Sequence, residues 1–163
     1  MANTDRPNGF RAATARPKIE QFEVAATQTI TVGDMVVVDS NGQVTIAAAG
    51  ASVACGVAAS ISASAAAGSA IQVYTDPEQV YEAQCSGTGT GVTAIYSTAT
   101  STACYDLEGT TGIQEINEDS TSGDLIQVIG IGRDPGTGDI SADGANQRFY
   151  CIINRTKNQL ITK

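Results

Sequence analysis

Histidine and tryptophan are absent from this sequence of 163 residues, and other aromatic residues are scarce, with three Phe and five Tyr. Without histidine, neither a Ser-His-Asp nor a Cys-His pair can activate a nucleophile, and an H-E-x-x-H zinc site cannot form. We therefore expect no enzyme activity, no catalytic residue, no metal and no cofactor. A hydrolase that uses carboxylates alone stays open as an alternative.

Basic residues are also few, since 9 Lys and Arg stand against 17 Asp and Glu, for a formal net charge of −8. This charge opposes contact with nucleic-acid phosphates, so we expect no nucleic-acid partner. No stretch approaches the roughly 18 apolar residues of a membrane helix, so we expect no membrane partner either.

The four cysteines are far apart and lack the C-x-x-C spacing of a zinc site. We interpret Cys55, Cys85, Cys104 and Cys151 as small buried hydrophobic residues. A disulfide between Cys85 and Cys104, which bracket one Gly- and Thr-rich excursion, is the alternative.

Acidic residues crowd two loops in the last third of the chain, and their spacing does not match an EF-hand. The pattern is typical of solvated loop carboxylates, with a weak calcium site as the alternative. These residues are Glu115, Glu118, Asp119, Asp124, Asp134, Asp139 and Asp143.

The clearest local signal is a hairpin within residues 29–45. A strand-like run at 35–39, which contains three consecutive β-branched residues, precedes Asn41-Gly42. This pair favours a two-residue type I′ turn, and an alternating segment follows. Val36, Val37 and Val38 are consecutive, so both faces of the strand are apolar. One face would meet the strand's own core and the other face something else, often a neighbouring subunit in a small domain.

Further strand-like segments recur, with turn residues about every ten positions, and no segment has helical periodicity. Residues 70–74 and 79–84, joined at Asp76-Pro77, predict a second hairpin. The pattern predicts an all-β chain with a single β-sandwich or barrel-like domain and an extended N-terminal arm. The other predicted strands are residues 19–24, 53–60, 92–96, 112–116, 125–131 and 148–154, and residues 27–31 lead into the first hairpin.

Residues 1–18 lack apolar periodicity and contain Pro7, Gly9 and Pro17, so they read as an extended arm ahead of a domain over residues 19–163. We expect that domain to fold without the arm, which would become ordered against a partner. The alternative is a disordered tail. The arm residues expected to contact such a partner, or another subunit, are Arg6, Phe10, Arg11 and Arg16.

Four blocks of the sequence stand out together: ANTDRPNGFR (2–11), VGDMVVVDSNGQVT (32–45), YTDPEQVYEAQ (74–84) and RFYCIINRTKNQL (148–160). In this order, they resemble blocks of the small head proteins of tailed bacteriophages called decoration, cement or capsid-stabilising proteins. The likeness spans most of the chain.

The resemblance implies a non-enzymatic virion protein on the capsid exterior, assembled in the host cytoplasm. Such a protein binds the outer surface of the shell and bridges neighbouring subunits of the major capsid protein, usually as a homotrimer. A carbohydrate-binding or tail-associated β module is the alternative, although the lack of Trp disfavours a carbohydrate-stacking surface.

Overall fold

A computed structural model describes residues 3–14, 17–25, 28–61, 68–89, 104–120 and 124–161. Within these segments the regular structure is β-strand, apart from one 3-10 turn, η1 (Arg155–Lys157). The predicted all-β class is confirmed. The strand expected at residues 92–96 lies outside the described residues.

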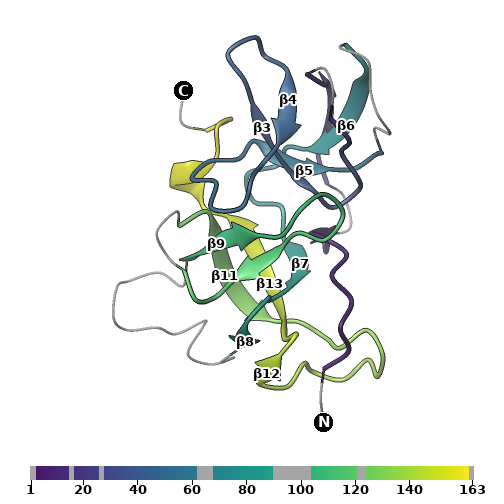
Figure 1. Ribbon diagram of the computed structural model, residues 1–163, viewed down its shortest axis with the longest axis vertical. Coiled ribbons are helices and arrows are strands. Elements are labelled where there is room, and N and C mark those ends of the chain that lie inside the picture. The colour runs from purple at the N-terminus through teal and green to yellow at the C-terminus, as the bar shows by residue number, and fades with distance from the viewer. Residues whose placement is uncertain are drawn as a thin grey trace.

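Two antiparallel sheets are stacked along the long axis of the molecule (Figure 1). The upper sheet has the order β2 (Ile19–Glu23), β6 (Ala70–Tyr74), β5 (Gly56–Ala58), β3 (Met35–Val38) and β4 (Val44–Ile46). The lower sheet has the order β1 (Arg11–Ala12), β7 (Tyr81–Gln84), β13 (Arg148–Ile153), β11 (Ile126–Ile131), β9 (Cys104–Glu108) and β10 (Glu115–Asn117). A small ribbon pairs β8 (Thr88–Gly89) with β12 (Gly144–Ala145).

Each sheet curls until its ends approach each other. A parallel bridge between Val24 and Val44 links the two ends of the upper sheet. In the lower sheet, a bridge between Cys85 and Ile116 joins the end of β7 to β10. This closure covers strand edges that would otherwise leave backbone groups unpaired.

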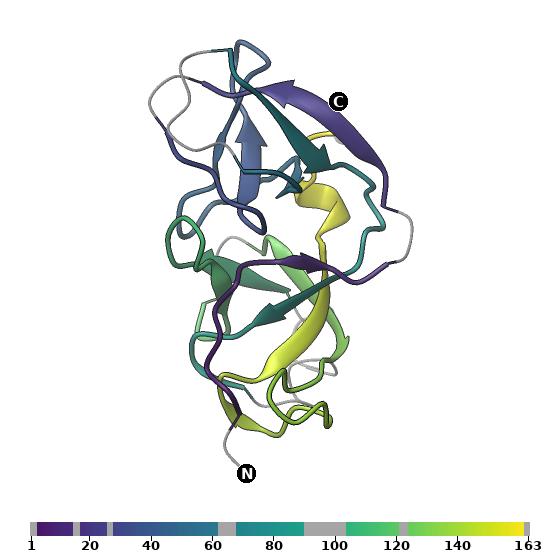
Figure 2. The same cartoon turned by 90° about the vertical axis from the view of Figure 1, so that its right-hand side faces the viewer.

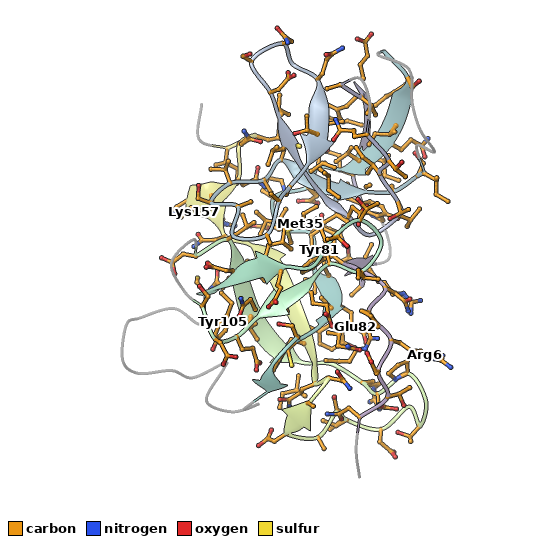
Figure 3. The ribbon with its side chains drawn as sticks, viewed as in Figure 1. Arg6, Met35, Tyr81, Glu82, Tyr105 and Lys157 are labelled. Atoms are coloured by element: carbon orange, nitrogen blue, oxygen red, sulfur yellow. The ribbon has the colours of Figure 1, made fainter. Side chains whose placement is uncertain are left out.

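The alternation of side chains along β3 explains how this strand of the upper sheet contributes to the cores of both sheets. Val36 and Val38 face the core enclosed by the upper sheet, whereas Met35 and Val37 pack on the core of the lower sheet. Figure 3 shows Met35 and Tyr81 at the boundary between the sheets. The second apolar face of the strand is therefore covered by the chain's own lower sheet, and not by a neighbouring subunit.

The first predicted hairpin is confirmed, but its turn type is wrong. Asn41 does not have the positive φ of a type I′ turn, whereas Gly42 has a φ of 78°. The Gly42 N–H donates to the Asp39 carbonyl (3.2 Å) and the Asp39 N–H to the Gln43 carbonyl (2.8 Å). This is a type I turn followed by a glycine bulge. The Asp39 carboxylate stabilises it by accepting from the Asn41 and Gln43 N–H groups.

The second predicted hairpin is wrong in its pairing. Its two strands exist, as β6 and β7, but β6 pairs with β2 and β5, whereas β7 pairs with β1 and β13. The turn at Asp76 forms as expected, because the Gln79 N–H donates to the Asp76 carbonyl. It carries the chain from the upper sheet to the lower one.

Candidate functional site

The N-terminal segment, residues 3–12, runs along the lower sheet up to the boundary with the upper sheet (Figure 2). The Asn3 amide donates to the carbonyls of Ala142 (2.8 Å) and Ala145 (2.9 Å). Thr4 donates its N–H and its hydroxyl to the two carboxylate oxygens of Asp134 (2.5 and 3.0 Å). The start of this segment is thus held by a loop from the far end of the chain.

A buried polar group holds the middle of the same segment. Arg148 is 1% exposed, and its guanidinium donates to the backbone carbonyl of Arg6. Gln84 accepts from the Arg6 N–H (2.8 Å) and donates to the carboxylates of Asp5 (2.9 Å) and Glu115 (2.8 Å). Burial lowers the pKa of Arg148 and raises that of Glu115.

Phe10 is 1% exposed and lies in the core of the lower sheet. Its N–H donates to the Gly33 carbonyl (2.8 Å), and the next two residues form β1 against β7. Phe10 was expected to dock onto a partner, but in this structure it fills a pocket of its own chain. We therefore withdraw Phe10 as a partner contact.

The expected arginine contacts fall into two groups. Arg6 and Arg11 are exposed, and Figure 3 shows the Arg6 side chain directed away from the body of the protein. The two ion pairs found among the described residues join Lys18 to Glu20 and Arg155 to Glu78, so neither Arg6 nor Arg11 takes part in one. Arg16 lies outside the described residues.

Two loops that sequence reasoning did not select meet beside Phe10. Asp34 is fully buried, and its carboxylate accepts from the Thr31 N–H and hydroxyl (both 2.8 Å) and from the Gly112 N–H (2.6 Å). These bonds tie a loop of the upper sheet to a loop of the lower sheet. Each loop presents one aliphatic side chain, Val32 (48% exposed) or Ile113 (49% exposed).

The sequence did contain a signal for these two loops. Val32 precedes Gly33 and Ile113 follows Gly112, and both glycines have a positive φ, of 96° and 79°. A β-branched residue beside a turn glycine is expected less often than a polar one. An aliphatic residue at such a turn is a candidate contact residue.

The acidic loops depart from the expectation at two positions. Asp119, Asp139 and Asp143 are exposed, as solvated carboxylates should be. Asp134 is buried, and four hydrogen bonds, the first of them from the Thr4 N–H, lower its pKa to about 2. Both carboxylate oxygens of Glu118 are buried, and this burial raises its pKa to about 7, although Cys85 acts in the opposite direction.

These acidic groups do not form a metal centre in the part of the chain that the structure describes, where no cluster of three or more Cys, Asp or Glu side chains could hold an ion. The four cysteines are all buried thiols, and no disulfide joins them, so Cys85 and Cys104 are not bridged. Burial raises the pKa of the Cys55 thiol to about 12, which makes it unreactive.

A groove of about 540 Å³ lies between β2, the β3–β4 hairpin and the end of the chain. Phe22, Val38 and Leu160 supply its apolar surface, and Asp39, Ser40 and Gln159 are among its polar residues. Among the described residues that line it, Phe22 is the one aromatic residue and Asp39 the one acidic residue.

The observations define an all-β protein of two curled, stacked sheets, with the N-terminal segment packed along the lower sheet and bonded to the start of β3. No helix in the described segments is long and apolar enough to cross a membrane. No protein-family model matches the chain, and no curated protein matches it in sequence.

Proposed function

We propose that this protein is a non-enzymatic virion structural protein that binds the outer surface of a phage capsid. It stabilises the shell by bridging neighbouring subunits of the major capsid protein. The observation that carries the proposal is that the four sequence blocks behind the resemblance form one connected frame in three dimensions.

Each of the four blocks, residues 2–11, 32–45, 74–84 and 148–160, contacts another block through the backbone. The first joins the second where the Phe10 N–H donates to Gly33, and it joins the third where Arg11 pairs with Glu82. The third joins the fourth where Glu82 pairs with Tyr150.

The fourth block returns to the second and closes the frame. The Gln159 side chain accepts from the Val38 N–H (2.8 Å) and donates to the Val38 carbonyl (3.1 Å), as a neighbouring strand would do. Because the blocks depend on each other structurally, their common order supports a shared fold more strongly than four independent short matches would.

The mechanism is thermodynamic linkage. A protein that binds the assembled shell, but not separated capsid subunits, stabilises the shell by its binding free energy at every site that it occupies. The homotrimer remains part of the proposal on the resemblance alone, because the apolar strand faces that first suggested it are covered within the chain.

The proposal is tested with shells assembled from the cognate major capsid protein. The purified protein should sediment with the shells, raise the temperature at which they fall apart, and leave separated subunits in the supernatant. An unchanged shell melting temperature together with no co-sedimentation would rule the proposal out. The alternative, a carbohydrate-binding or tail-associated module, would instead be supported by binding to glycans or tails.

A further inference from the structure

Segments that meet at the boundary between the two sheets carry exposed aliphatic and basic side chains. We call this region the junction surface and define it by Arg11, Val32 and Ile113, together with Arg6, which lies below the boundary on the same N-terminal segment (Figure 3). Its parts adjoin through the backbone: Phe10, next to Arg11, bonds to Gly33, next to Val32, while Gly112, next to Ile113, bonds to Asp34.

The backbone beneath the junction surface is rigidly held. Asp34 accepts three hydrogen bonds in a fully buried position and thereby locks both loops. The N-terminal segment is fixed by the burial of Phe10 and by its bond to Gly33. A surface that is ordered before binding loses little conformational entropy when a partner binds.

The two arginines of the junction surface carry a charge opposite to the net charge of the protein. The chain carries a net charge of −8, yet Arg6 and Arg11 are exposed and form no ion pair with any residue that the structure describes. Lys18 and Arg155, by contrast, each have a carboxylate partner. Two unpaired guanidinium groups beside aliphatic side chains are complementary to a partner surface with carboxylates around an apolar patch.

We propose that the junction surface is the face of this protein that docks onto an acidic, partly apolar surface of the capsid shell. Val32 and Ile113 make the central apolar contact, and Arg6 and Arg11 pair with carboxylates at the rim. This inference rests on the proposed function, because it assigns the contact face for the same binding event.

The apolar part is tested by replacing Val32→Ser and Ile113→Ser together and measuring co-sedimentation with shells. The matched control is Ile61→Ser with Ile140→Ser, because these isoleucines are even more exposed (63% and 68%) but lie outside the junction surface. The junction variant should bind the shell about tenfold more weakly or worse, and the control should bind as the unmodified protein does.

The charged part is tested with the double variant Arg6→Glu and Arg11→Glu. The matched control is the double variant Arg133→Glu and Lys157→Glu, because it changes the net charge by the same amount. The junction variant alone should lose affinity beyond the general effect of charge, and the affinity of the unmodified protein should fall with added salt. Thermal melting of every variant identifies any that fails to fold. If a double variant does not fold, the corresponding single variant, Val32→Ser or Arg11→Glu, is measured in its place.

The outcomes separate the two proposals. If the unmodified protein binds shells and the junction variants bind equally well, the inference is wrong and the proposed function stands. If the junction variants change self-association in sedimentation velocity but not shell binding, the surface joins copies of this chain and the inference is again wrong. If the unmodified protein does not bind shells at all, the proposed function fails and the inference fails with it.

Discussion

Gly9 and Gly33 approach each other so closely that neither position has room for a side chain. A Cβ atom on Gly9 would lie 2.5 Å from the Gly33 carbonyl oxygen, and one on Gly33 would lie 2.7 Å from the Asn8 carbonyl oxygen. Both residues also have a positive φ, of 66° and 96°. The contact brings the N-terminal segment against the start of β3, so it links the first two of the four sequence blocks.

Replacing Gly9→Ala should therefore destabilise the protein strongly. The positive φ alone costs a non-glycine residue about 1–2 kcal/mol, and the backbone contact adds to this cost. Gly50→Ala is the matched control, because Gly50 has a similar φ of 72° but nothing within 4 Å of its added Cβ. Urea unfolding should show a larger loss for Gly9→Ala, and equal losses would mean that the close approach has no energetic weight.

Phe10→Ala should lower the free energy of unfolding by about 3–5 kcal/mol, because it removes a fully buried ring from the core of the lower sheet. Phe10→Leu should cost less than about 1.5 kcal/mol, since it keeps most of the apolar volume.

Because Phe10 is part of the core, deleting residues 1–18 should impair folding. A truncated protein with an unchanged melting curve would contradict this.

Asp134→Asn should loosen the N-terminal segment at neutral pH. The pKa of Asp134 is lowered to about 2 in the folded state, so its contribution to stability is complete above pH 3.8 and is lost as the pH falls through 2. The substitution should remove this pH-dependent contribution to stability and expose the N-terminal segment to proteolysis at pH 7. Asp139→Asn, at an exposed carboxylate of the same loop, serves as the control.

The contribution of Glu118 to stability should depend on pH in the opposite sense to that of Asp134, and Glu118→Gln tests this. The folded state raises the Glu118 pKa from 4.5 to about 7, first by burial and then through Asp119 and Asp143, whereas Cys85 lowers it. Folding therefore favours the protonated acid, and stability is lost as the pH rises from 4.5 through 7. The substitution should raise the free energy of unfolding at pH 8 by about 1 kcal/mol, a figure reduced because the side chain is partly exposed to solvent.

Melting curves of the Glu118→Gln variant at pH 4.5 and pH 8 provide the measurement. The unmodified protein and the variant should be of similar stability at pH 4.5 and should diverge at pH 8. Glu23→Gln, at an exposed position of β2, should leave the difference between the two pH values unchanged. If Glu118→Gln behaves like Glu23→Gln, ionisation of Glu118 does not affect stability.

The sequence predicted those strands whose signal is local. Residues 35–38 and 44–46 form a hairpin because β-branched residues flank a turn, and Asp39 and Gly42 select the turn geometry. A glycine inside a predicted strand, such as Gly56 in the strand predicted over residues 53–60, is typical of a close backbone approach. An added Cβ there would indeed lie 2.2 Å from the Tyr74 carbonyl oxygen.

Features that depend on distant residues could not be predicted in this way. β1 has two residues and forms only because β7 lies beside it. Phe10 looked like a contact residue because its surroundings in the sequence are polar, whereas its pocket comes from strands much later in the chain. The junction surface likewise requires two loops, around Val32 and Ile113, that meet only in the folded protein.

The central place of β13 has a consequence for the order in which the protein folds during synthesis. The strands of the upper sheet lie within residues 19–74, so they can pair while the ribosome is still translating the rest. The lower sheet keeps a gap between β7 and β11 until Arg148–Ile153 emerges. The segment around Thr4 and Arg6 must therefore wait for Asp134 and Arg148, which are translated much later. A chain ended before β13 would expose the edges of β7 and β11 to aggregation.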